Sequence, residues 1–138
     1  MPDDAIERGA YVLHQAAPEP DCIIIATGSE VYLAVEAAET LEGEGIKANV
    51  VSMPCMDAFE QQDDAYKESV LPRSVRARVS VEAASVMGWD RYVGPDGEIV
   101  GMTTFGASGP QKALYEHFGF TPENIAEHVR TSVKRVSD

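Results

Sequence analysis

The most constraining feature of this sequence is the apolar run "CIIIAT", residues 22–27, which ends in a Gly-Ser turn. An apolar run without polar alternation predicts a β-strand that is covered on both faces, as in a parallel sheet between layers of helices. The segment after the turn has a helical apolar stripe, made of Val31, Ala34, Val35, Ala38 and Leu41. The stretch therefore predicts a strand–turn–helix unit, with Ser29 as the helix N-cap.

Other segments repeat this alternation of strand and helix. Four further stretches are β-prone: residues 9–15, 46–53, 77–83 and 99–102. Helices are expected in the acidic stretch after Pro54, over residues 110–117, and after Pro122. In the last of these, Ile125, Val129 and Val133 form the expected buried stripe. Strands that alternate with helices at this spacing predict an α/β domain with a mostly parallel sheet and helices on both faces.

Length and charge restrict the class of protein. The 138 residues are enough for one compact domain, and no apolar run approaches the roughly 20 residues that span a bilayer. The net charge of −12 opposes binding to nucleic acid or to an anionic membrane. Two cysteines, Cys22 and Cys55, are too few for a disulfide framework, so we expect reduced thiols in a cytoplasmic protein.

The turn after the first apolar run is a candidate phosphate site, because many nucleotide-binding domains hold a phosphate at such a junction. A dinucleotide fingerprint needs three glycines, G-x-G-x-x-G, whereas this turn reads T-G-S-E with Gly28 alone. Glu30 would stand where the phosphate sits, and its like charge would oppose phosphate binding by about 1 kcal/mol, as much as the helix dipole offers. A structural joint is therefore favoured over a phosphate site.

A second candidate lies at the end of the strand over residues 77–83. Glu82 falls at the carboxyl edge of the predicted sheet, which is where α/β domains usually bind ligands. The possible ligand or interface site of this chain consists of Thr27, Gly28, Ser29 and Glu82. No nucleophile, base and oxyanion donors gather in one place, so the residues alone indicate a scaffold or a binding module.

The remaining reactive or charged residues have simpler interpretations. Cys22 is expected in the core and Cys55 as a loop thiol, since no histidine lies near Cys55 in sequence. Basic residues concentrate at Arg73, Arg76, Arg78 and Arg91, and at the C-terminus. They could mark a partner surface, but solvent-exposed salt bridges are the favoured interpretation.

Seven motifs in fixed order make a family resemblance visible. They are "RGAYVL", "IIIATGSEVYLAVEAAETLEGEGIKANVVSMP", "YKESVLP", "ARVSVEA", "GWDRYVG", "GMTTFGASGP" and "FGFTPENI". Together, from about Arg8 to Val133, they resemble the C-terminal, third domain of the transketolase family. The departures are mild: Cys55 and Met56 stand where Ser-Thr is more usual, and "GASGP" replaces the commoner "GASAP".

The resemblance implies a three-layer α/β/α sandwich around a five-stranded, mostly parallel mixed sheet whose first strand is antiparallel. It also implies part of a homodimeric transferase that moves a two-carbon ketol unit between sugar phosphates in the pentose phosphate pathway. That enzyme uses thiamine diphosphate and Mg²⁺ or Ca²⁺, held by the two other domains. The family's G-D-G…N motif is missing here. The string "GPDGE" at 94–98 is interpreted as a turn and does not satisfy this motif.

No catalytic, cofactor-binding or metal-binding residue is therefore predicted in this chain, and the isolated chain is predicted to be inactive. Residues 1–138 are expected to form a single domain, with 1–7 as a residual linker or disordered N-terminus. Its expected partners are the N-terminal and middle transketolase domains, in the same subunit or in a separate chain. Two alternatives stay open: a stand-alone regulatory ligand-binding module, and the small subunit of a split transketolase.

Overall fold

The computed structural model describes residues 8–27, 31–82, 90–101 and 121–137 of the chain. Its centre is a five-stranded sheet with the strand order β1-β3-β2-β4-β5. The strands are β1 (Tyr11–His14), β2 (Cys22–Ala26), β3 (Ala48–Ser52), β4 (Arg78–Glu82) and β5 (Glu98–Gly101). β1 pairs antiparallel with β3, and the other three pairs are parallel. The predicted mixed sheet with an antiparallel first strand is confirmed.

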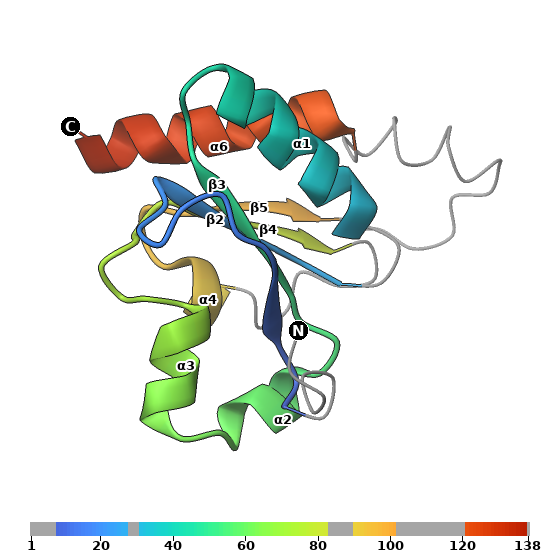
Figure 1. The fold of residues 1–138 in the computed structure, drawn as a ribbon, viewed down its shortest axis with the longest axis vertical. Helices are drawn as coiled ribbons and strands as arrows, with labels where there is room; N and C mark the ends of the chain where they lie inside the picture. Colours follow the sequence, from blue (N-terminus) through green and yellow to red (C-terminus); the bar gives the residue numbers. More distant parts are fainter. Residues whose placement is uncertain (1–7, 28–30, 83–89, 102–120, 138) are drawn as a thin grey trace, which may run out of the picture.

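Helices cover both faces of this sheet, as Figure 1 shows. One face carries α1 (Val31–Gly43) and α6 (Pro122–Ser137). The other carries three short helices: α2 (Met56–Glu60), α3 (Asp64–Val70) and α4 (Asp90–Val93). The predicted three-layer α/β/α arrangement is therefore confirmed. The helix expected over 110–117 and the Ser29 cap lie outside the described residues.

The central strand β2 contributes side chains to two separate hydrophobic cores. All five of its residues are buried, as the unbroken apolar run predicts. Ile24 packs on the side of α1 and α6, whereas Ile23 and Ile25 pack on the side of α2 and α4. Each fully buried isoleucine contributes about 1.5–3 kcal/mol of hydrophobic stabilisation. Because both faces of β2 are buried, its sequence is continuously apolar. A half-exposed strand would alternate apolar and polar residues.

The helix stripe expected after Pro122 is confirmed in its first two turns. Ile125 and Val129 are fully buried in α6, while Val133 is only partly buried where the helix reaches past the sheet. The buried face also includes a polar residue, Ser132, whose hydroxyl donates a 2.6 Å hydrogen bond to the carbonyl of Asp96. This bond satisfies Ser132 and fastens α6 to the turn before β5.

The acidic stretch after Pro54 forms two short helices, α2 and α3. Asp63 caps α3 by accepting a 2.8 Å hydrogen bond from the backbone N–H of Tyr66. That cap starts a new helix, so the chain turns between residues 60 and 64. The two helices bring Phe59 and Tyr66 together edge to face, with ring centroids 6.4 Å apart.

The first described residues are fastened to these helices. The Gly9 carbonyl accepts a 3.1 Å hydrogen bond from the backbone N–H of Cys55. The Tyr66 hydroxyl donates a 2.6 Å hydrogen bond to the carbonyl of Ala10, 56 residues earlier in the chain. The guanidinium of Arg8 lies over the Tyr66 ring, 4.6 Å from its centroid. The entry to β1 is therefore held by α2 and α3.

Candidate functional site

The predicted site lies at the carboxyl edge of the sheet. Ala26 of β2 pairs with Val81 of β4, so the next residues, Thr27 and Glu82, follow at the same edge. Thr27 is half-buried, and Glu82 is the last residue of β4. Gly28 and Ser29 lie outside the described residues. The structure thus brings the backbones of Thr27 and Glu82 together, and a ligand site there stays a prediction.

A cofactor held through a divalent cation needs a set of oxygen donors, because Mg²⁺ and Ca²⁺ bind carboxylate and carbonyl oxygens. Within residues 8–27, 31–82, 90–101 and 121–137, no group of three His, Cys, Asp or Glu side chains could hold a metal ion. The "GPDG" segment is a tight turn, closed by a 3.2 Å hydrogen bond from the Gly97 N–H to the Gly94 carbonyl. The described residues therefore do not fit a metal-diphosphate cofactor.

Both cysteines are free thiols, in different surroundings. Cys22 is fully buried, which confirms its predicted place in the core, and burial raises the pKa of its thiol well above the ordinary range. Cys55 is exposed and precedes α2, where its Sγ accepts a 3.4 Å hydrogen bond from the backbone N–H of Ala58. Cys55 thus caps a short helix, and burial makes Cys22 a poor nucleophile.

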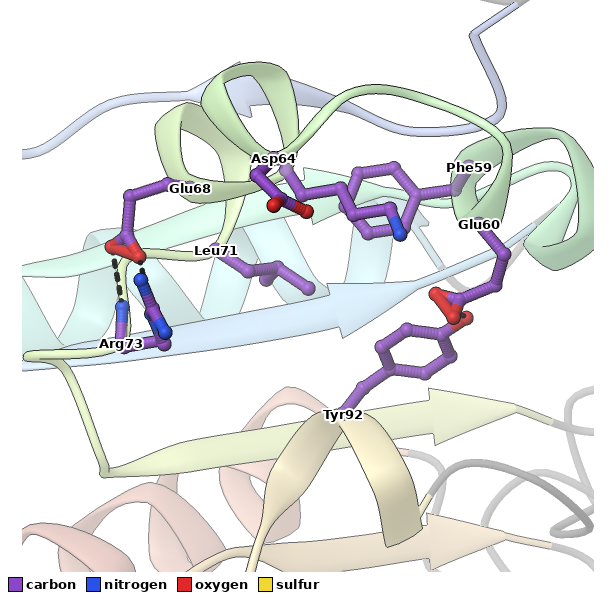
Figure 2. Close-up of a pocket in the computed structure, with 8 residues that line it drawn as sticks. Phe59, Glu60, Asp64, Glu68, Leu71, Arg73 and Tyr92 are labelled. Atoms are coloured by element: carbon purple, nitrogen blue, oxygen red, sulfur yellow. Dashed lines mark hydrogen bonds and ion pairs between the residues drawn. The ribbon is translucent and has the colours of Figure 1, made fainter.

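The layer formed by α2, α3 and α4 contains a pocket of about 280 Å³, shown in Figure 2. Its walls are Phe59, Glu60, Asp64, Lys67, Glu68, Leu71, Arg73 and Tyr92. Tyr92, which is buried as expected for a core aromatic, donates a 3.2 Å hydrogen bond to Glu60. Glu68 accepts from both the backbone N–H and the Nε of Arg73, at 2.7 and 3.0 Å. These bonds hold the pKa of Glu68 below its usual value.

Two carboxylates of this pocket, those of Glu60 and Glu68, therefore already accept hydrogen bonds from other residues that line it. Figure 2 shows Glu68 and Arg73 at one end and Glu60 beside Tyr92 at the other. The mixture of acidic and basic side chains does not favour a ligand of either charge. We interpret the pocket as a seam between the short helices.

Arg78, the first residue of β4, extends into the same helical layer. Its guanidinium donates to four backbone carbonyls, those of Val75 (2.9 Å), Tyr92 (2.8 Å), Leu71 (3.2 Å) and Pro72 (2.8 Å). Burial lowers the pKa of Arg78 from its usual value. No carboxylate of the described residues lies within ion-pair distance of it. Arg78 thus holds the loop before β4 and the end of α4 together.

A second pocket, also of about 280 Å³, opens beside Arg78 at the amino-terminal edge of β4. We call it the arginine pocket; its walls are Arg73, Val75, Arg76, Arg78, Tyr92, Val93, Gly94, Pro95 and Asp96. Arg76 lies 3.8 Å from the carboxylate of Asp96 and donates a 3.4 Å hydrogen bond to the Val136 carbonyl. Three cations and one carboxylate thus line one cavity.

The interpretation of the arginines as exposed salt bridges holds for two of them and is wrong for Arg78. Arg73 and Arg76 are exposed and pair with Glu68 and Asp96. Arg78 is half-buried because it alternates with Val79 along β4 and points to the opposite face of the sheet from that valine. The alternation of Arg78 with Val79 was the sequence signal for the burial of Arg78. The arginine pocket also depends on α4, whose position was not predicted.

The fold and the seven motifs can now be compared with known proteins. The sequence model of the "Transketolase-like TK C-terminal domain" family matches residues 9–121. The chain belongs to the transketolase family. Transketolase 1 of Escherichia coli K12 is 60% identical over 120 residues, which cover 87% of this chain and 18% of that relative. This transketolase domain therefore spans less than a fifth of the length of the curated relatives that it matches.

Solved structures agree with the sequence match. The transketolase from Leishmania mexicana superposes with a TM-score of 0.89 and 43% identity, over 98% of this chain and 19% of that one. A second structure, "Split gene transketolase, inactive beta4 tetramer", has a TM-score of 0.74 and 29% identity, over 93% of this chain and 43% of that one. None of the described helices of the transketolase domain is long and apolar enough to cross a membrane.

Proposed function

We propose that this chain is the structural and subunit-packing C-terminal domain of a thiamine diphosphate-dependent transketolase. The whole enzyme would transfer a two-carbon ketol unit from a ketose phosphate to an aldose phosphate, as a homodimer in the cytoplasm. The free thiols of Cys22 and Cys55 support a reducing compartment. The isolated chain would have no ketol transfer activity.

One observation carries this proposal: the family model covers residues 9–121, yet the chain spans only 18% of its 60%-identical relative. The chemistry of the described residues agrees with it, because they offer no set of donors for a divalent cation. The remaining four fifths of such an enzyme would hold the cofactor and the sugar phosphates. This domain would contribute a rigid α/β body that packs beside them.

Two measurements test the proposal. Calorimetric titration of thiamine diphosphate with Mg²⁺ into the chain should give no binding heat, whereas micromolar affinity would contradict it. Ketol transfer should appear only when the N-terminal and middle domains are supplied together with this chain. Activity of the chain alone would also contradict the proposal.

A split enzyme is the second candidate, supported by the likeness to the split-gene transketolase over 93% of this chain. In that case the chain would be part of a small subunit that pairs with a separately encoded one. The reading frame upstream decides between the two. A G-D-G…N motif in frame with this domain supports the single-chain enzyme, and the same motif in a separate gene supports the split one.

A further inference from the structure

We propose that the arginine pocket binds the phosphate group of a small phosphorylated molecule. This site lies at the amino-terminal edge of β4, at the opposite end of that strand from Glu82. It uses only residues of this chain, so it is independent of the proposed function. The charge of Arg78, the two arginines near it and the shape of the cavity all favour a phosphate there.

Arg78 is a half-buried cation with no carboxylate of the described residues within ion-pair distance, although Glu68 acts on it from farther away. Its four bonds to backbone carbonyls use four of the five N–H donors of a guanidinium. Carbonyl dipoles satisfy those donors but carry no net negative charge, so only the more distant Glu68 offsets the positive charge in part. A charge removed from water is costly unless an opposite charge approaches it, so the cavity wall at Arg78 favours an anion.

Arg73 and Arg76 add two mobile cations to the same cavity. Their side chains are 91% and 60% exposed, and each has one carboxylate partner, Glu68 and Asp96 respectively. The Arg76–Asp96 separation of 3.8 Å is long for a charge-assisted hydrogen bond, so this pair is easily replaced. Guanidinium groups match the oxygens of phosphate in pairs, which favours phosphate over a monoatomic anion.

The net charge of the chain does not prevent such binding. Although the chain carries a charge of −12, exposed charges more than about 8 Å away are largely screened at physiological ionic strength. The nearby charges decide: three cations face Asp96 inside the arginine pocket and Glu68 just outside it, which leaves one net positive charge. Its volume of about 280 Å³ leaves room for a few carbon atoms beside a phosphate, along the apolar surfaces of Val93 and Pro95.

The test is calorimetric titration of glycerol 3-phosphate into the 138-residue chain at constant ionic strength. Inorganic phosphate and glycerol are titrated in parallel, so that the contributions of the phosphate and of the carbon skeleton are separated. We expect both phosphates to bind and glycerol not to bind. Absence of heat with both phosphates at millimolar concentration would overturn the proposal.

Matched variants locate the site. Arg76→Gln and Arg73→Gln should each weaken glycerol 3-phosphate binding about tenfold, the effect of one charge-assisted hydrogen bond. Lys47→Gln removes one positive charge outside the pocket and should leave the affinity unchanged. Equal weakening by all three variants would show nonspecific charge attraction and would overturn the proposal. Melting curves check that the Arg73 and Arg76 variants are folded. Arg78 itself is not substituted in this test, because its hydrogen bonds also stabilise the fold.

A protein carboxylate is the competing occupant of this pocket. The titration is therefore repeated with the chain assembled with the N-terminal and middle domains. Retained phosphate binding supports the proposal. Binding that is lost on assembly would show that another domain fills the pocket, and the proposal would be overturned.

Discussion

Arg130 of α6 donates two hydrogen bonds, of 2.9 and 2.7 Å, to the carboxylate of Glu44, 86 residues earlier in the chain. Glu44 directly follows α1, so this bidentate contact joins the end of one helix to the middle of the other on the same face of the sheet. The hydrogen bonds from Arg130 lower the pKa of Glu44 below its usual value. The same contact raises the pKa of Arg130.

The first prediction follows from this lowered pKa. A carboxyl whose pKa is lower in the folded state stabilises the fold above its unfolded pKa and loses that effect as the pH falls through its folded pKa. Glu44→Gln should therefore lower the melting temperature slightly at pH 7, because both side chains of the pair are exposed. The deficit should disappear as the pH falls from about 5 to about 3.

Thermal melts of both proteins across this pH range make the measurement. Glu39→Gln is the control, since Glu39 is exposed on α1 and has no hydrogen bond or ion pair within the described part of the chain. A deficit of Glu44→Gln that stays constant down to pH 3 would contradict the ion-pair explanation.

The second prediction concerns two buried serines. The hydroxyl of Ser80 is fully buried in β4 and has no hydrogen-bond partner among the described residues, whereas that of Ser132 donates to Asp96. An unpaired buried hydroxyl costs about 1–3 kcal/mol, so Ser80→Ala should raise the free energy of unfolding by about 1 kcal/mol. Ser132→Ala should lower it by about 1 kcal/mol, because a hydrogen bond is lost.

Denaturant unfolding of the two alanine variants provides the measurement. The two substitutions remove the same atom from equally buried serines, so opposite signs isolate the effect of the hydrogen bond. Destabilisation of similar size in both variants would show that packing of the hydroxyl dominates.

The third prediction concerns Gly9, which has a φ of +89°. A Cβ there would collide with the backbone carbonyl oxygen of Cys55 and the backbone nitrogen of Phe59, neither of which can move aside cheaply. Gly45 has a similar φ of +87° but no atom near the position of a Cβ. Gly45→Ala should therefore cost about 1–2 kcal/mol, the ordinary strain of a left-handed residue.

Gly9→Ala should cost several kcal/mol more than that strain, because it also separates the start of β1 from α2. The two alanine variants are compared by urea unfolding. Equal losses of stability would show that the close approach of Gly9 to α2 does not matter.

The fourth prediction concerns the carbonyl contacts of Arg78. Arg78→Met keeps the unbranched part of the side chain as far as the position of Nε but removes all four donated hydrogen bonds, and we expect a loss of about 2–4 kcal/mol. Arg76→Gln, which affects an exposed arginine of the same pocket, should cost less than about 1 kcal/mol. Chemical denaturation measures both, and a loss for Arg78→Met as small as that for Arg76→Gln would contradict the structural role.

Periodicity predicted the strands of this domain well because burial dictates residue type. β2 and β3 are buried along their whole length; β2 is entirely apolar, and β3 is apolar except for Asn49 and Ser52, so their sequence has few alternatives to a central strand. The antiparallel direction of β1 had a different origin, because it came from the family resemblance. Nothing in four half-exposed residues dictates a strand direction.

The pockets could not be predicted in this way. Both depend on the packing of short helices, which is decided by contacts between residues far apart in sequence, such as Tyr92 with Glu60. The predicted edge site rests on the positions of the strand ends, and the pairing of β2 with β4 places Thr27 beside Glu82. A ligand there stays a prediction, because strand order places backbones and does not select a ligand.

The order of the strands also has a consequence for how the domain folds. β4 and β5 pair the residues that lie closest in sequence, Val79 with Glu98, and β2 and β3 come next, with Cys22 opposite Ala48. These two parallel pairs are therefore the most local units of the sheet. Of the five strands of this sheet, β1 leaves the ribosome first, yet its neighbour in the sheet is β3, which is made after β2 and α1. β1 must therefore wait for its template, and it can join the sheet only after β3 has been made.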